Sequence, residues 1–267
     1  MDVYQAVLLG FFQGVTEFLP VSSSGHLVLG ETFFQLQPSE FLFFDLILHL
    51  ATLLAVCLYF KNRLIELISN VCLFFFKKEQ SRSDVILSLA ILLSTVITGS
   101  IGIAFKDFLE QLRDQLPMVG VCFLLTGVLL LSTRFYRTSP KEETPYPPNI
   151  WLFAVSLGLA QALAIAPGIS RSGVTICTAL LLGTARPRAV EYSFLMSIPA
   201  ILGATILEMK DATLSMQLLP ALGGFLSALV FGVLFLWILV WIVNKGKLHH
   251  FAYYTVPLGL WVLWYSL

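Results

Sequence analysis

Two copies of one polar motif interrupt the most apolar stretches of this chain. Residues 13–25 read QGVTEFLPVSSSG, and residues 161–173 read QALAIAPGISRSG. In both copies Gln and Gly are twelve positions apart, Pro lies near the middle, and the segment ends in Ser-x-Ser-Gly. Polar residues at membrane depth are costly in free energy, so two matched polar clusters indicate one site that is assembled from two halves of the chain.

The composition places this motif in a membrane. The chain is 57% hydrophobic and only 12% charged, whereas soluble domains carry about 25% charged residues. The sequence therefore indicates an integral membrane protein in contact with membrane lipids. The formal net charge is zero, so nothing favours a nucleic-acid partner. The four cysteines are scattered through apolar segments without a CxxC pair and are interpreted as small buried residues.

A membrane-spanning helix needs about 20 mostly apolar residues. Two apolar regions, 3–34 and 150–183, are each broken in the middle by Pro, Ser and Gly, which leaves halves that are short for a full span. We expect each to be a re-entrant helix–loop–helix hairpin whose broken tip is sheltered by protein or by a water-filled cavity. Six further stretches fit spanning helices: about 42–60, 85–105, 117–133, 192–207, 217–243 and 251–267.

The distribution of cations gives these segments an orientation. If the first hairpin enters from outside and the second from inside, three cations lie in outer loops: Lys106, Arg113 and Lys210. Twelve lie in inner loops: Lys61, Arg63, Lys77, Lys78, Arg82, Arg134, Arg137, Lys141, Arg186, Arg188, Lys245 and Lys247. This asymmetry agrees with the positive-inside rule and places both termini outside.

The predicted fold is therefore an all-α integral membrane protein, with six transmembrane helices plus two re-entrant hairpins arranged as an inverted-topology repeat. The chain forms a single membrane domain, 1–267, in which repeat one covers about 1–138 and repeat two about 149–267. Each half contains one hairpin and three spans, and an odd number of spans inverts the second half. We expect a multi-pass protein of the plasma membrane, with its site at mid-depth and open to the outer side.

The helix starts in both motifs predict an anion site. In the first copy Pro20 ends one helix, and Ser22 or Ser23 is placed to cap the next. In the second copy Ser170 caps a helix that continues through Arg171, Ser172 and Thr175. Free N–H groups and the positive dipole ends of two helices would meet near the midplane, and Arg171 adds a planar fork that matches phosphate oxygens. The residues indicate a buried phosphate or carboxylate site.

Glu17 and His26 indicate chemistry at that site. Gln13 and Glu17 are four residues apart on one helix face and could hold Mg²⁺ through oxygen atoms. His26 lies about one helical turn after Ser23 and could act as acid, base or nucleophile. We favour Ser23 as the nucleophile and His26 as its proton carrier; His26 itself and a positioned water remain alternatives. Asp45 and His49 are interpreted as a structural pair.

These residues resemble the undecaprenyl-diphosphate phosphatase family of bacteria, the integral membrane type that confers bacitracin resistance. The resemblance rests on Gln13–His26 and Pro167–Thr175 and extends over essentially the whole chain. It implies removal of the terminal phosphate of undecaprenyl diphosphate, a polyprenyl diphosphate lipid, to recycle the carrier of cell-wall precursors. It also implies a divalent cation, Mg²⁺ or Ca²⁺.

The roles expected from the motifs and the resemblance fall into three sets. We expect catalysis from Glu17, Ser23, His26 and Arg171. Substrate binding is expected from Gln13, Ser22, Ser24, Ser170, Ser172 and Thr175, and metal binding from Glu17 with Gln13. The family's acidic motif allows Glu or Gln first, and the Gln found here weakens a two-carboxylate metal site. Members commonly have Tyr-Arg where this chain has Tyr254-Thr255.

The main alternative is a lipid-phosphate flippase or secondary transporter, because inverted repeats with broken helices around a midplane anion site are also transporter architecture. Release of phosphate distinguishes the enzyme from the carrier. A second type of membrane lipid phosphatase is excluded, because it needs another His after its Ser-Arg and none follows Arg171 before His249. A homodimer is a further alternative to a single chain.

Overall fold

A computed structural model describes residues 1–34, 38–77, 82–136, 149–210 and 217–266. Within these ranges all regular structure is helical, which confirms the predicted all-α class. The first half contains α1 (Val3–Thr16), α2 (Ser23–Phe34), α3 (Pro38–Tyr59), α4 (Lys61–Lys77), α5 (Arg82–Ala104), α6 (Lys106–Asp114), α7 (Leu116–Ser132) and the short 3-10 helix η1 (Thr133–Phe135). The second half contains α8 (Ile150–Leu163), α9 (Arg171–Leu181), α10 (Arg186–Glu208), α11 (Leu218–Asn244), η2 (Leu248–Phe251) and α12 (Ala252–Tyr265).

Several helices are long and apolar enough to cross a membrane, and the chain is a multi-pass membrane protein. Within the described residues, four such helices are α5, α7 with η1, α10 and α11, and a fifth arises if α3 and α4 form one span bent by 77°. The predicted sixth span, 251–267, contains α12, a helix of only 14 residues. This is shorter than the roughly 20 residues of a typical span, so the count of six remains a prediction.

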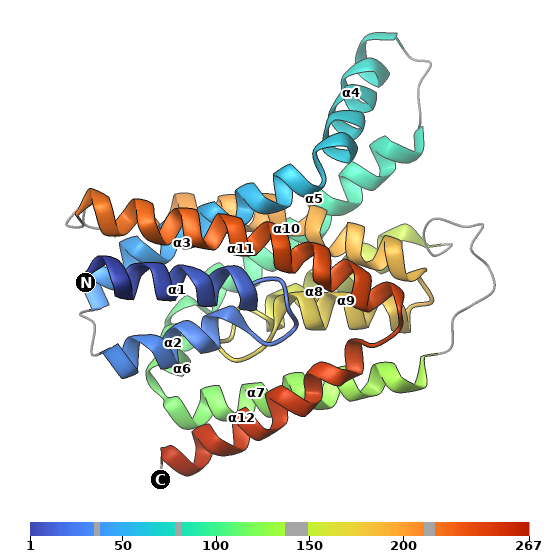
Figure 1. Ribbon diagram of the computed structural model, residues 1–267. Coiled ribbons are helices and arrows are strands. Elements are labelled where there is room, and N and C mark those ends of the chain that lie inside the picture. Colours follow the sequence, from blue (N-terminus) through green and yellow to red (C-terminus); the bar gives the residue numbers. More distant parts are fainter. Residues whose placement is uncertain (35–37, 78–81, 137–148, 211–216, 267) are drawn as a thin grey trace.

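Both interrupted regions form two short helices around a break, as expected for hairpins. α1 and α2 have 14 and 12 residues, and α8 and α9 have 14 and 11. Figure 1 shows α1 and α2 running side by side, and α8 beside α9. The second break includes Gly168 at φ +97°, a conformation that L side chains rarely adopt. A Cβ there would also lie 2.5 Å from the carbonyl oxygen of Val119 on α7. Both the backbone conformation and the lack of space therefore require glycine at this position.

The first helix of each hairpin packs closely on a helix from the other half of the chain. α1 lies along α11, and a Cβ on Gly10 would clash with the backbone of Gly224. α8 lies along α5, and a Cβ on Gly158 would lie 2.9 Å from the carbonyl oxygen of Ser94. Small residues that let helix backbones approach are the usual means of helix association in membranes. These contacts hold α1 against α11 and α8 against α5.

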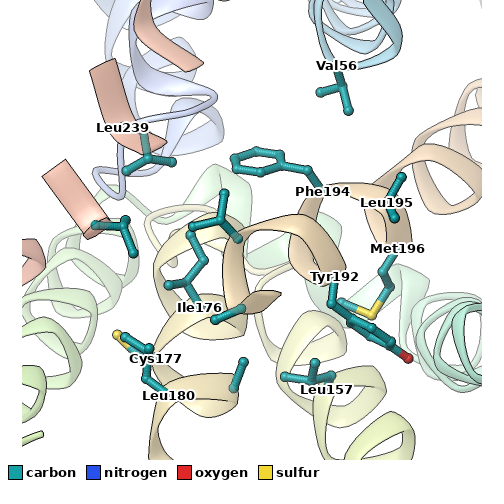
Figure 2. Packing of buried hydrophobic residues seen from close by; sticks show 14 of the residues in the cluster. Val56, Leu157, Ile176, Cys177, Leu180, Tyr192, Phe194, Leu195, Met196 and Leu239 are labelled. Carbon is teal, nitrogen blue, oxygen red and sulfur yellow. The ribbon is translucent and has the colours of Figure 1, made fainter. Parts of the chain in front are cut away.

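The largest apolar core cluster anchors the second hairpin. Figure 2 shows Ile176 and Cys177 of α9 and Tyr192, Phe194 and Met196 of α10 in one buried cluster, together with Leu157 and Leu239. Tyr192 is fully buried, and its hydroxyl lies 3.0 Å from the hydroxyl of Ser94 on α5. A buried tyrosine hydroxyl normally needs such a partner. α9 is therefore held by packing along its length, which gives its N-terminus a fixed position.

Candidate active site

The two broken tips contact each other, so the two motif copies form one cluster. The backbone N–H of Gly168 in the second tip donates to the Ser22 hydroxyl of the first at 3.1 Å. Ser22 also caps α2, because its hydroxyl accepts from Gly25 N at 3.3 Å. Its φ of +68° turns the chain sharply between the break and the helix. One buried serine therefore starts the first motif's helix and joins it to the second motif.

Glu17 is the centre of the cluster. Its side chain is buried, and its Oε2 accepts from Gln13 Nε2 at 3.1 Å and from the Ser23 hydroxyl at 2.5 Å. Its other oxygen, Oε1, pairs with the guanidinium of Arg171. The structure therefore brings together four of the predicted site residues. A buried carboxylate requires this compensation, since an unpaired charge is very costly in a low-dielectric environment.

His26 lies beside the cluster but has other partners. Its Nδ1 is 2.7 Å from the carbonyl oxygen of Ser22, and its Nε2 is 2.7 Å from the hydroxyl of Tyr254 on α12. Both ring nitrogens are thus engaged, while the hydroxyl of Ser23 donates to Glu17. The sequence-based hypothesis made His26 the proton acceptor of Ser23. In this arrangement the group that is in place to take that proton is Glu17.

The second tip shows the predicted helix cap. The Ser170 hydroxyl accepts from Gly173 N at 3.1 Å and lies 3.3 Å from the hydroxyl of Ser172. Thr175 is turned away from the tip, because its hydroxyl contacts the carbonyl oxygen of Arg171 at 2.7 Å and the hydroxyl of Ser193 at 2.6 Å. Ser170 and Ser172 therefore lie at the helix start, whereas Thr175 supports α9 from within.

Two polar residues of the site were not identified from the sequence. Thr126 of α7 is 1% exposed; it donates to the carbonyl oxygen of Gly168 at 2.9 Å and accepts from Ser170 N at 3.0 Å. A threonine within an apolar span is a signal that could have found it. Tyr254 was noted in the sequence only where the resembling family has a Tyr-Arg pair, and it was given no role, because tyrosines near membrane surfaces are common. Its neighbour Thr255 is fully buried, and its hydroxyl has no partner among the described residues.

Two buried polar atoms at the site are without a hydrogen-bond partner among the described residues. One is Oε1 of Gln13, an acceptor, and the other is Nη1 of Arg171, a donor. Buried polar groups are nearly always satisfied, so such atoms indicate a ligand, an ion or water. An acceptor beside a carboxylate suits a cation, and an unused arm of a guanidinium suits an anion. The described residues contain no group of three or more His, Cys, Asp or Glu that could hold a metal alone.

A second ionic cluster involves residues of α2, α3 and α6, and its His49 also interacts electrostatically with Glu17. His49 Nδ1 is 3.0 Å from the Asp45 carboxylate, which confirms that these residues pair. Arg113 of α6 is 3.1 Å from Glu31 of α2 and 4.0 Å from Asp45. Burial lowers the pKa of the Arg113 guanidinium, but the carboxylates of Asp45 and Glu31 outweigh this effect and hold that pKa above its usual value. These ion pairs connect α2, α3 and α6.

Comparisons with known proteins agree with the motifs. The family described as "Bacitracin resistance protein BacA" matches residues 6–261. An undecaprenyl-diphosphatase of Treponema denticola is 39% identical over 97% of this chain and 96% of its own length. One of Carboxydothermus hydrogenoformans is 40% identical, over 98% and 97%. One of Alkaliphilus metalliredigens is 36% identical over the full length of both. The chain belongs to the BacA family of bacitracin resistance proteins.

Proposed function

We propose that this protein is an undecaprenyl-diphosphate phosphatase, a membrane hydrolase that converts a polyprenyl diphosphate to the monophosphate. Its similar relatives carry the name undecaprenyl-diphosphatase. The observation that supports this function most is the arrangement around Glu17, which joins a serine hydroxyl from one motif to an arginine from the other. A nucleophile, its base and a phosphate-binding cation are the components that phosphoryl transfer needs.

The proposed topology is the inverted repeat. Two pairs of helix contacts agree with such a repeat. The contact of α1 with α11 corresponds to that of α8 with α5, and the contact of α3 with α11 corresponds to that of α10 with α5. Ser227 donates to the carbonyl oxygen of Val7 in the first pair, and Ser94 to that of Ala154 in the second. The cation distribution supports an orientation with both termini outside and the site open to the outer side. The long prenyl tail would remain in the bilayer while its diphosphate reached the tips.

The proposed reaction has two steps. In the first, the Ser23 hydroxyl gives its proton to Glu17, and Ser23 Oγ forms a bond to the terminal phosphorus. The bond from that phosphorus to the bridging oxygen breaks, and the polyprenyl monophosphate leaves. In the second, water attacks the phosphoserine and gives a proton to Nε2 of His26; the bond to Ser23 breaks, and Ser23 recovers a proton from Glu17. Inorganic phosphate is then released, and His26 gives the proton on Nε2 to solvent, which restores the starting state. Direct attack by water or by His26 remains the alternative.

Arg171 is proposed to change partners when substrate binds. Without substrate it neutralises Glu17, and one arm of its fork, Nη1, is buried and unused. A diphosphate is a stronger partner for the whole fork, since guanidinium groups bind phosphate oxygens through two parallel bonds. Ser170 and Ser172, together with the N-terminus of α9, would hold the same phosphate. Ser22 and Ser24 would do so at the start of α2.

A divalent cation, Mg²⁺ or Ca²⁺, is part of the proposal. The unpaired Oε1 of Gln13 and the carboxylate of Glu17 are both oxygen donors, which these ions prefer. Two protein oxygens cannot complete a shell of six or more, so substrate oxygens and waters would supply the remainder. When bound, the cation would neutralise charge on the diphosphate. Movement of Arg171 to the phosphate would free Oε1 of Glu17 for this contact.

Phosphate release from undecaprenyl diphosphate by the detergent-solubilised protein tests this function. Wild type should release phosphate, EDTA should suppress release, and Mg²⁺ should restore it. Glu17→Ala, His26→Ala and Arg171→Ala should each reduce release. Activity that survives the chelator and all three substitutions would contradict the site assignment. Transbilayer movement of lipid in sealed proteoliposomes without release of phosphate would favour the flippase or transporter.

A further inference from the structure

The imidazole of His26 is held in a defined orientation and tautomer. Nδ1 faces the carbonyl oxygen of Ser22 at 2.7 Å. A carbonyl oxygen accepts hydrogen bonds and never donates, so Nδ1 carries a hydrogen atom. Any proton that His26 takes up or gives away is therefore exchanged at Nε2. The atoms around Nε2 determine what His26 can do.

Tyr254 is the residue at Nε2. Its hydroxyl lies 2.7 Å from that nitrogen, and its ring is nearly parallel to the imidazole, with centroids 5.7 Å apart and an interplanar angle of 9°. On another side, the ring of Phe123 meets the imidazole edge-on at 5.4 Å and 87°. With Nδ1 already a donor, the neutral ring accepts at Nε2 from the tyrosine hydroxyl. Tyr254 thus donates a hydrogen bond to Nε2 with its ring aligned with the imidazole.

The helix that carries Tyr254 is held closely against the site. A Cβ on Gly259 of α12 would lie 2.8 Å from the carbonyl oxygen of Gly120 on α7, so the two helices touch backbone to backbone. α7 also carries Thr126 and Phe123, which contact the second tip and His26. The adjacent Tyr253 differs from Tyr254. It is more exposed, 63% against 49%, and its ring lies near His250 at 6.1 Å. Tyr253 therefore serves as a control for Tyr254.

We propose that Tyr254 is a positioning residue for His26 in the phosphatase reaction. This inference rests on the proposed function. The tyrosine hydroxyl keeps Nε2 unprotonated and correctly oriented, and it occupies the position that the attacking water takes during the second step. Tyr254 is partly exposed while Ser22 is 3% exposed. Tyr254, the partner that water can replace at Nε2, is therefore on the open side of the imidazole. Ser22, the permanent partner at Nδ1, is on the buried side.

The kinetic test is Tyr254→Phe, which keeps the ring and removes the hydroxyl. We expect kcat for phosphate release to fall about tenfold, as for other groups that orient a functional histidine, with KM within about twofold. Tyr253→Phe is the matched control and should behave as wild type. Wild-type kcat in Tyr254→Phe would overturn the proposal.

A double-mutant cycle separates positioning of His26 from helix packing. If Tyr254 acts through His26, Tyr254→Phe should cause no further loss in a His26→Ala background. The same fold loss in both backgrounds would mean that Tyr254 supports α12 instead, and would contradict the proposal.

A spectroscopic readout does not depend on activity. The ring ¹⁵N resonances of the chain's four histidines can be assigned to His26 with His26→Ala. Tyr254→Phe should shift the His26 Nε2 resonance, and Tyr253→Phe should leave it unchanged. An unchanged His26 resonance in Tyr254→Phe would rule out the contact. If wild type releases no phosphate, the proposed function fails, and this measurement still decides whether Tyr254 holds the imidazole.

Discussion

The two hairpin tips share a side-chain capping pattern, although their backbones differ: φ is +68° at Ser22 and −78° at Ser170. Counted back from the Gly that ends each motif, Ser22 corresponds to Ser170, and both hydroxyls accept from the backbone N–H three residues later, at 3.3 and 3.1 Å. Each also lies near the hydroxyl two residues later, at 3.4 Å from Ser24 and 3.3 Å from Ser172. The duplicated sequence therefore specifies a duplicated helix start.

The chemistry of the tips is not duplicated. Where the first copy has Glu17 and His26, the second has Ile165 and Val174. Where the first has Ser23, the second has Arg171. In our account the first tip therefore carries out the reaction and the second holds the anion. This asymmetry favours an enzyme over a carrier that would use two equivalent tips.

The largest effect that should separate the tips is that of Glu17→Gln. Loss of the base for Ser23 and of the partner of Arg171 should lower kcat by about 10³-fold, in the range of general-base and electrostatic effects. The equivalent position in the second tip provides the control, and Ile165→Ala should retain near-normal turnover. Phosphate release measured on both variants checks this, and comparable losses would mean that the tips are not functionally distinct.

A smaller effect is expected where the second tip is held by α7. Thr126→Val keeps the shape of the side chain but removes the bonds to Gly168 and Ser170. We expect kcat/KM to fall about tenfold, as for supporting hydrogen bonds in other sites, and Thr126→Ser to restore most of it. Thr133→Val is the matched control for Thr126→Val, because among the described residues the buried Thr133 hydroxyl bonds only to the carbonyl oxygen of Leu130. A Thr126→Val enzyme with normal kinetics would remove Thr126 from the site.

The smallest effects should come from the glycines that let α1 pack on α11 and α8 pack on α5. A Cβ on Gly14 of α1 would lie 2.7 Å from the carbonyl oxygen of Ala228, and one on Gly158 of α8 would lie 2.9 Å from that of Ser94. Gly14→Ala and Gly158→Ala should each reduce stability by about 1–3 kcal/mol through overpacking. Gly99→Ala is the control, because nothing lies within 4 Å of its added Cβ. Thermal unfolding in detergent compares the three, and equal transition temperatures would show that the glycine contacts are not needed.

Features that depend on local sequence were predicted correctly. Pro20 and Pro167-Gly168 interrupt helices, and Ser22 and Ser170 cap the next ones, because backbone geometry and a side chain a few residues away decide these outcomes. The spacing of Gln13 and Glu17 likewise placed their side chains in contact.

Features that depend on tertiary contacts were missed. Arg171 was expected to hold phosphate and Glu17 a cation, but no local pattern shows that they pair when substrate is absent. Thr126 and Tyr254 reach the tips from α7 and α12, far away in the sequence.

The division of labour between the tips is tested most directly by comparing Ser23→Ala with Ser172→Ala. The measurement is kcat and KM for phosphate release from undecaprenyl diphosphate. Ser23→Ala should lower kcat by about 10³-fold, since it removes the nucleophile, and Ser172→Ala should raise KM while kcat stays within about threefold. Near-normal turnover in Ser23→Ala, or an equal loss of kcat in Ser172→Ala, would contradict the account.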